Sequence, residues 1–530
     1  MIGALRIILR AVVTTDVVVI GAGFGGLAAA IAAAEFGLRT VVLERTATVG
    51  GSTSHSYGGV WVANSGAVRG LKQRDSRAAA LRYMEYVGGG QTDPERVSAY
   101  IDNAPRALAF YQHAGIRLAP TPSLPDHFYG IADGAMPDGR HFDVAPFPGR
   151  ELRSWRESLE TPAGDGWRAP LGRPLSDDLR ARARTRDEIC QGAGLVAYAL
   201  RSALDRNVEI LLKVGMERLL MRKGRVVGVR TADGREFSAK RGVVIASGGF
   251  ESDTALSAMA ENLPLTRSVH APTIAGDGFR MAADVGASFR IIHNNLAVLL
   301  AYDEPALPPG RNVRVIANKE LVAPHGIIVN LAGERFGNEG SFQQLAGALR
   351  AFDGATRQPR NLPCRLVFDR QFVERNGFGL GGPGTVPDWV VRADSLDELA
   401  VAAGIDATNL AATVARFNGF AAAGVDRDFA RGESGWKLAQ LTGVGPNPGL
   451  GTLEKPPFFA VPLTPTAMGA SGLAADRSAR VLDWWDVPIP GLYAVGNAAA
   501  HDEYGVGYQA GQSLGSAMTF AFLAVEALAA

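Results

Sequence analysis

The stretch Thr14–Gly51 constrains the fold more than any other part of the chain. Asp16–Ile20 is a short apolar run rich in β-branched residues, which predicts a buried strand, and the alanine-rich stretch Gly25–Phe36 predicts a helix. Gly37 ends this helix, and Thr40–Leu43 is a second apolar run. The order strand, helix, strand within a stretch of this length predicts a βαβ unit.

The glycines between the first strand and the helix match the pattern GxGxxG, with Gly21, Gly23 and Gly26 at its three positions. They permit a tight turn, bring the backbone close to a pyrophosphate and let the helix pack on the strand. The helix N-terminus offers its N–H groups to the phosphates. Glu44 follows the second strand, where a carboxylate can bind both hydroxyls of a ribose. Together these features predict a dinucleotide-binding unit.

The rest of the chain predicts an α/β protein with a second domain inserted into the first. Turn signals at Lys223 and Asp233, each followed by glycine, predict hairpins. A later strand, "RGVVIASGGF", has no GxGxxG, so we expect no site for a nicotinamide nucleotide. We predict a Rossmann-like domain formed by residues 1–288 and 441–530, and a smaller α+β cap domain formed by residues 289–440.

Composition excludes several classes of protein. The net charge of +1 gives no signal for a nucleic-acid partner. Cys190 and Cys364 stand alone without metal spacing, so we expect neither disulfides nor a metal site. This cysteine usage predicts a reducing, cytoplasmic compartment. No apolar run reaches the roughly 18 residues of a membrane span. We interpret Met1–Val13 as a surface extension, and weak contact with a membrane surface stays open. The sequence carries no signal for an oligomeric state.

Several motifs resemble one known family. "ERTATVGGSTSHSYGGVWV", "ASGGF", "GDGFRMAADVGA", "VNLAGERFGNE", "IPGLYAVGNAAA" and "GSAMTF" occur in matching order over nearly the whole chain. This order resembles the flavoprotein family of fumarate reductases and 3-ketosteroid dehydrogenases, and "GGVW" and "GSAMTF" favour the Δ1-dehydrogenase branch. The resemblance implies FAD in the Rossmann-like domain, with the cap over its isoalloxazine. The FAD is expected to be non-covalent, because the covalent histidine of the succinate dehydrogenases has no counterpart.

The resemblance also implies FAD contacts at the positions that match the family motifs. Gly21, Gly23 and Gly26 would face the pyrophosphate, and Glu44 would face the adenosine ribose. The helix that begins at Ser513 would point its positive N-terminus at the flavin. The other implied contacts are Gly50, Gly51, Ser52, Thr53, Val214, Ala246, Ser247, Gly248, Gly496, Asn497 and Leu514.

Dehydrogenation beside a ketone needs a group that holds the carbonyl oxygen and a base that takes a proton. By resemblance, "GYQAGQSLG" assigns the carbonyl to Tyr508 and Gly511, although the motif is one residue shorter than in the family. The cap tyrosine that serves the family as base falls at Phe342, and a phenyl ring cannot move a proton. The candidate replacements are Tyr129, Tyr302, Tyr504 and Tyr57.

The resemblance therefore implies an FAD-dependent dehydrogenase that introduces a C=C bond next to the carbonyl of a cyclic ketone such as a 3-ketosteroid. Its partners would be a small apolar ketone and a quinone or another electron acceptor. One alternative is a flavin-dependent reductase of an activated C=C bond in an enone or a fumarate-like acid. The other is a flavin-binding protein without turnover. The last helix is preceded by no arginine–histidine constellation, which favours a neutral ketone over a dicarboxylate.

Overall fold

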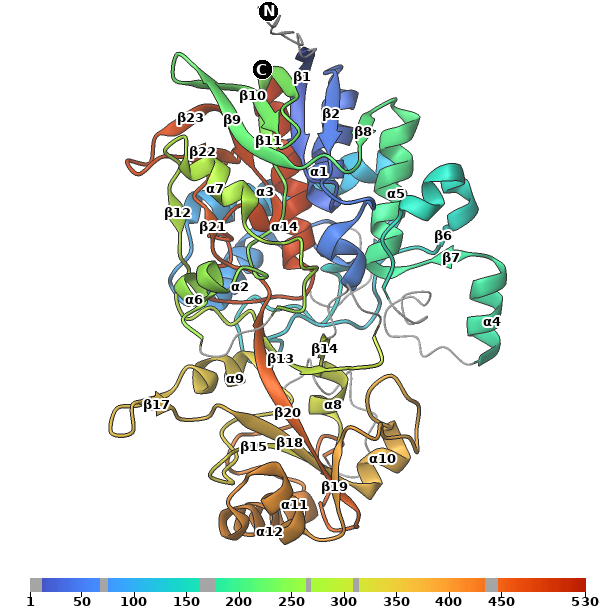
Figure 1. The fold of residues 1–530 in the computed structure, drawn as a ribbon, viewed down its shortest axis with the longest axis vertical. Coiled ribbons are helices and arrows are strands. Elements are labelled where there is room, and N and C mark those ends of the chain that lie inside the picture. The colour runs from blue at the N-terminus through green and yellow to red at the C-terminus, as the bar shows by residue number, and fades with distance from the viewer. Residues whose placement is uncertain (1–11, 67–74, 163–176, 264–267, 308–313, 434–446) are drawn as a thin grey trace, which may run out of the picture.

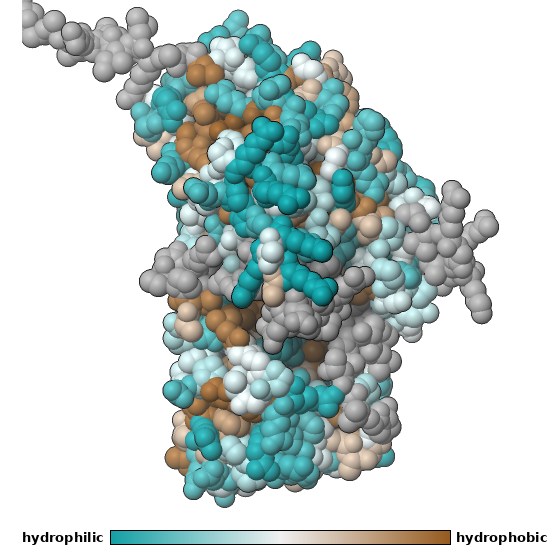
Figure 2. All heavy atoms as spheres, turned by 90° about the vertical axis from the view of Figure 1, so that its right-hand side faces the viewer, coloured by the Kyte–Doolittle hydropathy of each residue, from teal (hydrophilic) through white to brown (hydrophobic). Residues whose placement is uncertain are grey.

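The computed structural model describes residues 12–66, 75–162, 177–263, 268–307, 314–433 and 447–530. These residues form two bodies stacked along the longest axis of the molecule, the larger at the top of Figure 1 and the smaller at the bottom. Each body is built on its own main sheet. The space-filling view in Figure 2 shows apolar side chains reaching the surface at the waist between the two bodies.

The main sheet of the larger body has the strand order β22-β23-β11-β1-β2-β8, and β10 and β9 extend it from β11. β1, β2, β8, β11 and β23 are mutually parallel, so their carboxyl ends meet at one edge. This confirms the predicted βαβ unit, and the antiparallel pairs β9–β10 and β10–β11 confirm the two hairpins. The strands are β1 (Val12–Ile20), β2 (Thr40–Leu43), β8 (Glu209–Leu211), β9 (Met216–Arg222), β10 (Arg225–Thr231), β11 (Glu236–Ile245), β22 (Arg480–Leu482) and β23 (Pro488–Ala494).

Both faces of this sheet are covered. Val17 and Val19 of β1 pack on the face that carries α1, α3, α5 and α14, whereas Val18 and Ile20 pack on the face that carries α6 and α7. Successive side chains of a strand point to opposite faces, which explains why β1 is apolar without interruption. The helices are α1 (Phe24–Glu35), α2 (Arg77–Gly88), α3 (Pro94–His113), α5 (Gln191–Asp205), α6 (Thr254–Glu261), α7 (Asp277–Ala283) and α14 (Gln512–Ala529).

Short elements complete the larger body. β3, β5 and β4 form one small sheet, and β6 pairs with β7. β12 pairs with β21, and the chain leaves for the smaller body after β12 and returns before β21. The elements are β3 (Val60–Trp61), β4 (Leu118–Pro120), β5 (His141–Val144), β6 (Phe147–Pro148), β7 (Glu188–Ile189), β12 (Phe289–Arg290), β21 (Gly472–Leu473), α4 (Asp177–Thr185) and the 3-10 helices η1 (Gly51–His55), η2 (Gly149–Ser158) and η4 (Gly496–Ala498).

The smaller body is a sheet between two layers of helices. Its strand order is β14-β13-β20-β18-β15, and β19 also pairs with β20. Leu366 and Phe368 of β18 face α8, α9 and α10, whereas Val367 faces α11 and α12. The elements are β13 (Val298–Asp303), β14 (Arg314–Ile316), β15 (Gly326–Asn330), β16 (Phe352–Asp353), β17 (Gln358–Pro359), β18 (Cys364–Asp369), β19 (Val391–Ala393), β20 (Phe458–Ala467), α8 (Asn318–Val322), α9 (Phe342–Leu349), α10 (Arg370–Asn376), α11 (Leu396–Ala403) and α12 (Ala407–Ala423).

The strand β20 corrects one predicted boundary. A boundary at residue 440 would assign β20 to the larger body, but β20 pairs with β13, β18 and β19 of the smaller sheet. An apolar strand can join either sheet, so the sequence alone did not distinguish the two. We propose that the cap domain comprises residues 291–471, between the paired strands β12 and β21.

The helix α14 is the one described helix that is long and apolar enough to cross a membrane by length and composition. It packs against α1 and α3 in the core of the larger body, and 67% of its apolar window is buried. We therefore interpret α14 as a core helix. The sequence-based interpretation of the N-terminus falls mostly on residues 1–11, which lie outside the described residues, and Val12 already begins β1.

A buried ion cluster lies inside the cap. Arg335 forms ion pairs with Glu339 at 2.8 Å and with Asp426 at 2.9 Å, and none of the three side chains is more than 4% exposed. Arg431 adds a contact to Glu339 at 3.2 Å. Although burial opposes it, the neighbouring Arg335 holds the pKa of both carboxyl groups below its usual range.

We expect Arg335→Ala to lower the free energy of unfolding of the cap by about 3–5 kcal/mol, because it leaves two buried carboxylates without their main counter-charge. Urea unfolding followed by circular dichroism measures the change. Arg416→Ala is the matched control, since Arg416 pairs with Asp428 on the surface and such pairs add little to stability. Equal destabilisation by the two variants would contradict the prediction.

Candidate active site

The residues predicted to bind a dinucleotide lie together at the carboxyl edge of the larger sheet. Gly21 follows β1, Glu44 follows β2, Ala246 follows β11, and Val214 lies three residues after β8. Gly496 begins η4, close behind β23. Because these five strands are parallel, their carboxyl ends open onto one crevice, which is where parallel α/β sheets bind their ligands.

The three glycines of the GxGxxG pattern differ in what surrounds them. Gly21 has a φ of 102°, and a Cβ there would lie 2.5 Å from the Ala246 carbonyl oxygen. A Cβ on Gly26 would lie 2.0 Å from the Gly21 carbonyl oxygen. At Gly23 the nearest atom to such a Cβ is the Gly50 carbonyl oxygen, 3.6 Å away. Gly21 and Gly26 exclude a side chain for packing reasons. Gly23 instead leaves space at the N-terminus of α1 that fits a pyrophosphate.

The Glu44 carboxylate is fixed at the end of β2. Its Oε2 accepts a hydrogen bond from the Ala22 N–H at 2.9 Å, and its Oε1 accepts from the N–H of Thr46 at 2.8 Å and from its hydroxyl at 2.9 Å. The Val214 N–H donates to the Glu44 carbonyl oxygen at 2.8 Å. The two residues predicted to contact the adenosine half of the cofactor are thus neighbours.

The segment that contains Gly50, Gly51, Ser52 and Thr53 runs beside the N-terminus of α1. Gly50 is bridged to Gly23, and the Thr53 hydroxyl lies 3.3 Å from the Phe24 nitrogen, which donates to it. Ser247 and Gly248 continue from Ala246 at the end of the central strand β11. The structure therefore brings these residues to the same edge as the GxGxxG turn.

The N-terminus of α14 lies at this edge as well. Gly511 precedes the helix with a φ of 80°, and Ser513 and Leu514 occupy its first turn. A Cβ on Gly496 would lie 3.6 Å from the Ala517 Cβ, so η4, which also holds Asn497, packs on the start of this helix. The positive dipole end of α14 suits a partner that carries negative charge.

Comparisons with known proteins agree with this arrangement. The model of a family described as FAD binding domain matches residues 16–517. The chain is 34% identical over 553 residues to a 4-oxocyclohexanecarboxylate 2-dehydrogenase of Sinomonas cyclohexanicum, covering 97% of this chain and 93% of that protein. The chain belongs to the FAD-binding flavoprotein family of 3-ketosteroid dehydrogenases and fumarate reductases. It is an FAD-dependent oxidoreductase, and the glycines, Glu44 and the α14 N-terminus fit that cofactor.

Two further relatives of this flavoenzyme are informative. It is 33% identical over 560 residues to a 3-oxosteroid 1-dehydrogenase of Mycobacterium tuberculosis (strain ATCC 25618 / H37Rv), covering 96% of this chain and 97% of that one. The crystal structure of 3-ketosteroid Δ1-dehydrogenase from Sterolibacterium denitrificans in complex with 1,4-androstadiene-3,17-dione superposes with a TM-score of 0.86. The two chains are 29% identical, and the match covers 97% of this chain and 99% of the other.

Tyr508 lies just before α14 and is partly buried. Its ring centroid is 5.6 Å from that of His127, and its hydroxyl interacts electrostatically with Tyr57. Burial raises the pKa of the Tyr508 hydroxyl, so the phenol keeps its proton at neutral pH. Downstream, the Gly511 carbonyl oxygen accepts a hydrogen bond from the Trp61 N–H at 3.1 Å. The segment from Tyr508 to Gly511 is thus attached to β3.

Gln509, which is not among the predicted site residues, fixes the Tyr508–Gly511 segment through its side-chain hydrogen bonds. Its Oε1 accepts hydrogen bonds from the Tyr83 hydroxyl and, at 3.0 Å, from the His127 N–H. Its Nε2 lies 3.2 Å from the His141 Nε2. Burial lowers the pKa of His141 to about 3, so this ring is neutral and can accept that hydrogen bond.

The cap reaches this segment through Gln343 of α9. The Gln343 Nε2 lies 2.7 Å from the His127 Nδ1 and 3.5 Å from the Tyr508 carbonyl oxygen. Phe342, where the family has its base, begins the same helix. The two bodies therefore meet at Tyr508, and His127 and Gln343 are parts of the site that no sequence motif indicated.

Two of the candidate bases are placed in apolar cores. Tyr302 is 1% exposed and packs against Phe378 in the cap, with its hydroxyl 3.5 Å from a Glu320 carboxylate oxygen. Tyr504 is 0% exposed, and its ring centroid lies 5.5 Å from that of Tyr100. Because neither side chain offers accessible surface to a substrate, we propose that both are packing residues.

The other two candidates keep accessible surface. Tyr129 is partly buried in the turn that follows His127. Tyr57 is 54% exposed, follows η1, and interacts with Asn318 of α8 in the cap. Tyr57 thus lies between the two bodies, next to Tyr508.

We expect Tyr302→Phe and Tyr504→Phe to change the rate of substrate-dependent FAD reduction by no more than about threefold, because each removes a buried hydroxyl that makes at most a modest net hydrogen bond. Stopped-flow absorbance under anaerobic conditions measures this rate. A loss of a hundredfold or more in either variant, with FAD still bound, would return that tyrosine to the catalytic site.

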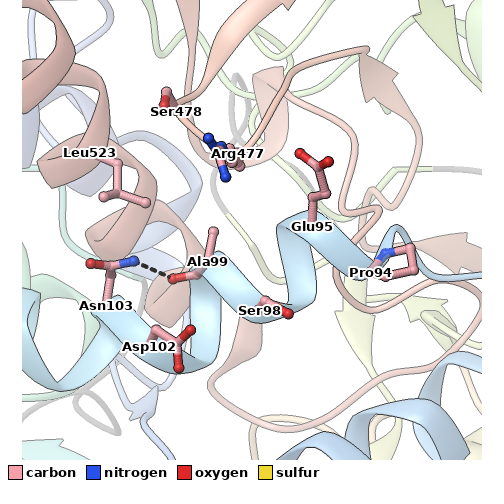
Figure 3. Close-up of a pocket in the computed structure, with 9 residues that line it drawn as sticks. All are labelled: Pro94, Glu95, Ser98, Ala99, Asp102, Asn103, Arg477, Ser478 and Leu523. Atoms are coloured by element: carbon pink, nitrogen blue, oxygen red, sulfur yellow. Dashed lines mark hydrogen bonds between the residues drawn. The ribbon is translucent and has the colours of Figure 1, made fainter.

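A separate hollow of about 650 Å³ lies between α3, α14 and the turn at residues 477–478 (Figure 3), and none of the predicted site residues lines it. The residues that line the hollow are Pro94, Glu95, Ser98, Ala99, Asp102, Asn103, Arg477, Ser478 and Leu523.

Within the part of the chain that the structure describes, no group of three or more His, Cys, Asp or Glu side chains could hold a metal ion.

Proposed function

We propose that this flavoenzyme introduces a C=C bond next to the carbonyl of a cyclic ketone, such as a 3-ketosteroid or a smaller alicyclic ketone. The observation that carries the proposal is the segment from Tyr508 to Gly511, which lies between the N-terminus of α14 and the α9 helix of the cap. The relatives support the substrate class, because the names of two of them specify a 3-oxosteroid and a 4-oxocyclohexanecarboxylate.

In this proposal the Tyr508 hydroxyl and the Gly511 N–H donate hydrogen bonds to the ketone oxygen. Both donors stabilise the negative charge that grows on this oxygen as the neighbouring C–H bond breaks. Tyr508 suits the role because burial raises the pKa of its phenol and keeps it protonated. Bound FAD supplies the hydride acceptor for the second carbon.

We assign the role of the base, which accepts the proton from the substrate, to Tyr57. It is the most exposed of the tyrosines considered, it interacts with Tyr508, and it faces the cap through Asn318. Burial raises the pKa of the Tyr57 phenol, and the hydrogen bond with Asn318 partly offsets this by favouring the phenolate that a base requires. Tyr129 is the alternative acceptor, since it also keeps accessible surface.

Anaerobic mixing tests the proposed reaction. A 3-ketosteroid or 4-oxocyclohexanecarboxylate should bleach the yellow oxidised enzyme and yield a product lighter by two hydrogen atoms. If no cyclic ketone reduces the flavin, the proposal fails. Reoxidation of the dithionite-reduced enzyme by fumarate or an enone would favour a reductase. A substrate screen with an artificial acceptor that finds no turnover would favour a binding protein.

We propose a quinone or a similar organic acceptor as the oxidant, because the segment after β11 lacks the glycine pattern of a second dinucleotide site. Reoxidation of the reduced enzyme by menadione but not by NAD+ would support this acceptor.

We further propose a cytoplasmic location, in keeping with two buried cysteines, Cys190 and Cys364, that form no disulfide.

A further inference from the structure

His501 lies in a chain of buried polar contacts behind Asn497. Its side chain is 2% exposed, its Nε2 lies 3.1 Å from the Asn497 Oδ1, and its Nδ1 lies 3.1 Å from the Glu503 Oε1. Glu503 is 0% exposed, and its Oε2 accepts from Arg96 at 2.9 Å and 3.1 Å. The chain thus runs from η4, at the cofactor edge of the sheet, to α3.

The Asn497 amide can be oriented in only one way. Its Nδ2 lies 3.0 Å from the Met468 carbonyl oxygen, which can only accept a hydrogen bond. The reversed amide would place two acceptors against each other, so the network fixes the assignment. The Asn497 Oδ1 therefore faces His501, and because this oxygen also only accepts, the His501 Nε2 must carry a hydrogen.

The other side of the ring leads to the same requirement. Burial opposes ionisation of Glu503, but the charge of the adjoining Arg96 outweighs it and the Ser516 hydroxyl also donates to the carboxylate, so the pKa of Glu503 lies below its usual range. The Glu503 carboxylate is therefore ionised and can only accept. The His501 Nδ1 must carry a hydrogen too, and an imidazole with hydrogen on both nitrogens is a cation.

We propose that His501 is a buried imidazolium that orients the Asn497 amide and adds a fixed positive charge beside the cofactor. Among these three side chains the two cations outnumber the Glu503 carboxylate by one charge, and the buried Glu251 carboxylate also lies close to Asn497, beside Gly469. Asp502, the acid next to Glu503, is 3.5 Å from Arg290, and the Tyr504 ring lies 6.5 Å from the His501 ring. This inference rests on the proposed contact of Asn497 with FAD. His501 is a positioning residue, and its charge favours reduced flavin, which is anionic.

The midpoint potential of the bound flavin tests the role of this charge. In His501→Gln, which keeps a donor for Asn497 but loses the charge, we expect the ratio of reduced to oxidised flavin at a fixed dye potential to fall at least tenfold. For a two-electron couple this tenfold fall corresponds to a midpoint potential that is lower by about 30 mV. The matched control is His113→Gln, at the exposed end of α3, which should leave the potential unchanged. An unchanged potential in His501→Gln would overturn the proposal.

The protonation state itself is measurable in the wild-type enzyme. With 15N-labelled histidine at neutral pH, the His501 signals should be those of a ring protonated on both nitrogens, as its contacts with Asn497 and Glu503 require. Their loss in His501→Gln assigns them, and if that variant does not retain FAD, their shift in Asn497→Asp does so. A neutral ring would refute the inference. Neither measurement uses a ketone, so failure of the proposed reaction is a separate result.

Discussion

Tyr508→Phe is expected to slow the reduction of bound FAD by a cyclic ketone on the order of 100-fold, the usual cost of losing one donor to a developing oxyanion. In the proposed site the Tyr508 hydroxyl donates to the ketone oxygen, and Gln509 and Gln343 hold the Tyr508–Gly511 segment in place without using that hydroxyl. The variant should therefore keep its fold and its FAD. Anaerobic stopped-flow absorbance gives the rate of flavin reduction, and the flavin spectrum reports cofactor content.

Tyr86→Phe is the matched control, because Tyr86 is 47% exposed on α2 and belongs to no proposed contact. It should reduce FAD at the wild-type rate. Tyr57→Phe should also slow the reduction of FAD by the ketone. If Tyr57 is the base, the rate of this variant should no longer rise as the pH increases. A Tyr508→Phe enzyme with wild-type rates would show that another group holds the ketone oxygen.

Gly23→Ala is expected to weaken FAD binding by about 100-fold, equivalent to about 2.7 kcal/mol, without unfolding the protein. The added methyl has room in the protein itself, since its nearest neighbour is a carbonyl oxygen 3.6 Å away. The backbone at Gly23, with φ −73° and ψ 178°, suits any residue. The methyl would instead fill the space in front of α1 where the pyrophosphate is proposed to lie. Titration of the apoenzyme with FAD measures the affinity.

Gly26→Ala provides the contrast for this prediction. A Cβ at Gly26 would lie 2.0 Å from the Gly21 carbonyl oxygen, so the helix and the strand must move apart. The melting temperature of the apoenzyme should fall in Gly26→Ala and stay at the wild-type value in Gly23→Ala. Equal melting temperatures, or full FAD affinity in Gly23→Ala, would contradict the assignment of the pyrophosphate to this turn.

The cofactor half of the site could be predicted from sequence because its signals are local. The GxGxxG turn, the flanking strands and Glu44 lie within about 30 residues, the usual size of a βαβ unit, and each position has a specific conformational or packing requirement. The remaining FAD contacts came from motifs that follow parallel strands. Parallel strands with buried faces place such motifs at one edge regardless of their distance along the chain.

The substrate half could not be predicted in this way, because its contacts join segments that share no motif. Gln509 meets His127 and His141, and Gln343 meets His127 across the two bodies. Burial was the second difficulty. A tyrosine within an apolar strand, such as Tyr302, has the same sequence pattern whether its hydroxyl faces a substrate or the core. Strand β20 was misplaced for a similar reason, since either sheet accepts an apolar strand.

The pairing of β12 with β21 has a consequence for how the cap could be exchanged between related enzymes. Arg290 and Gly472 are paired neighbours on β12 and β21, although the whole cap lies between them along the chain. A short turn could therefore join them and leave the larger body with an unbroken backbone. The larger body, which carries the proposed FAD contacts together with Tyr508 and Gly511, would then be one continuous module, and the cap would be an insert that adds Gln343 to the site. Grafting the insert of a relative at this junction would therefore change the cap side of the site and leave Tyr508, Gly511 and the cofactor scaffold in place.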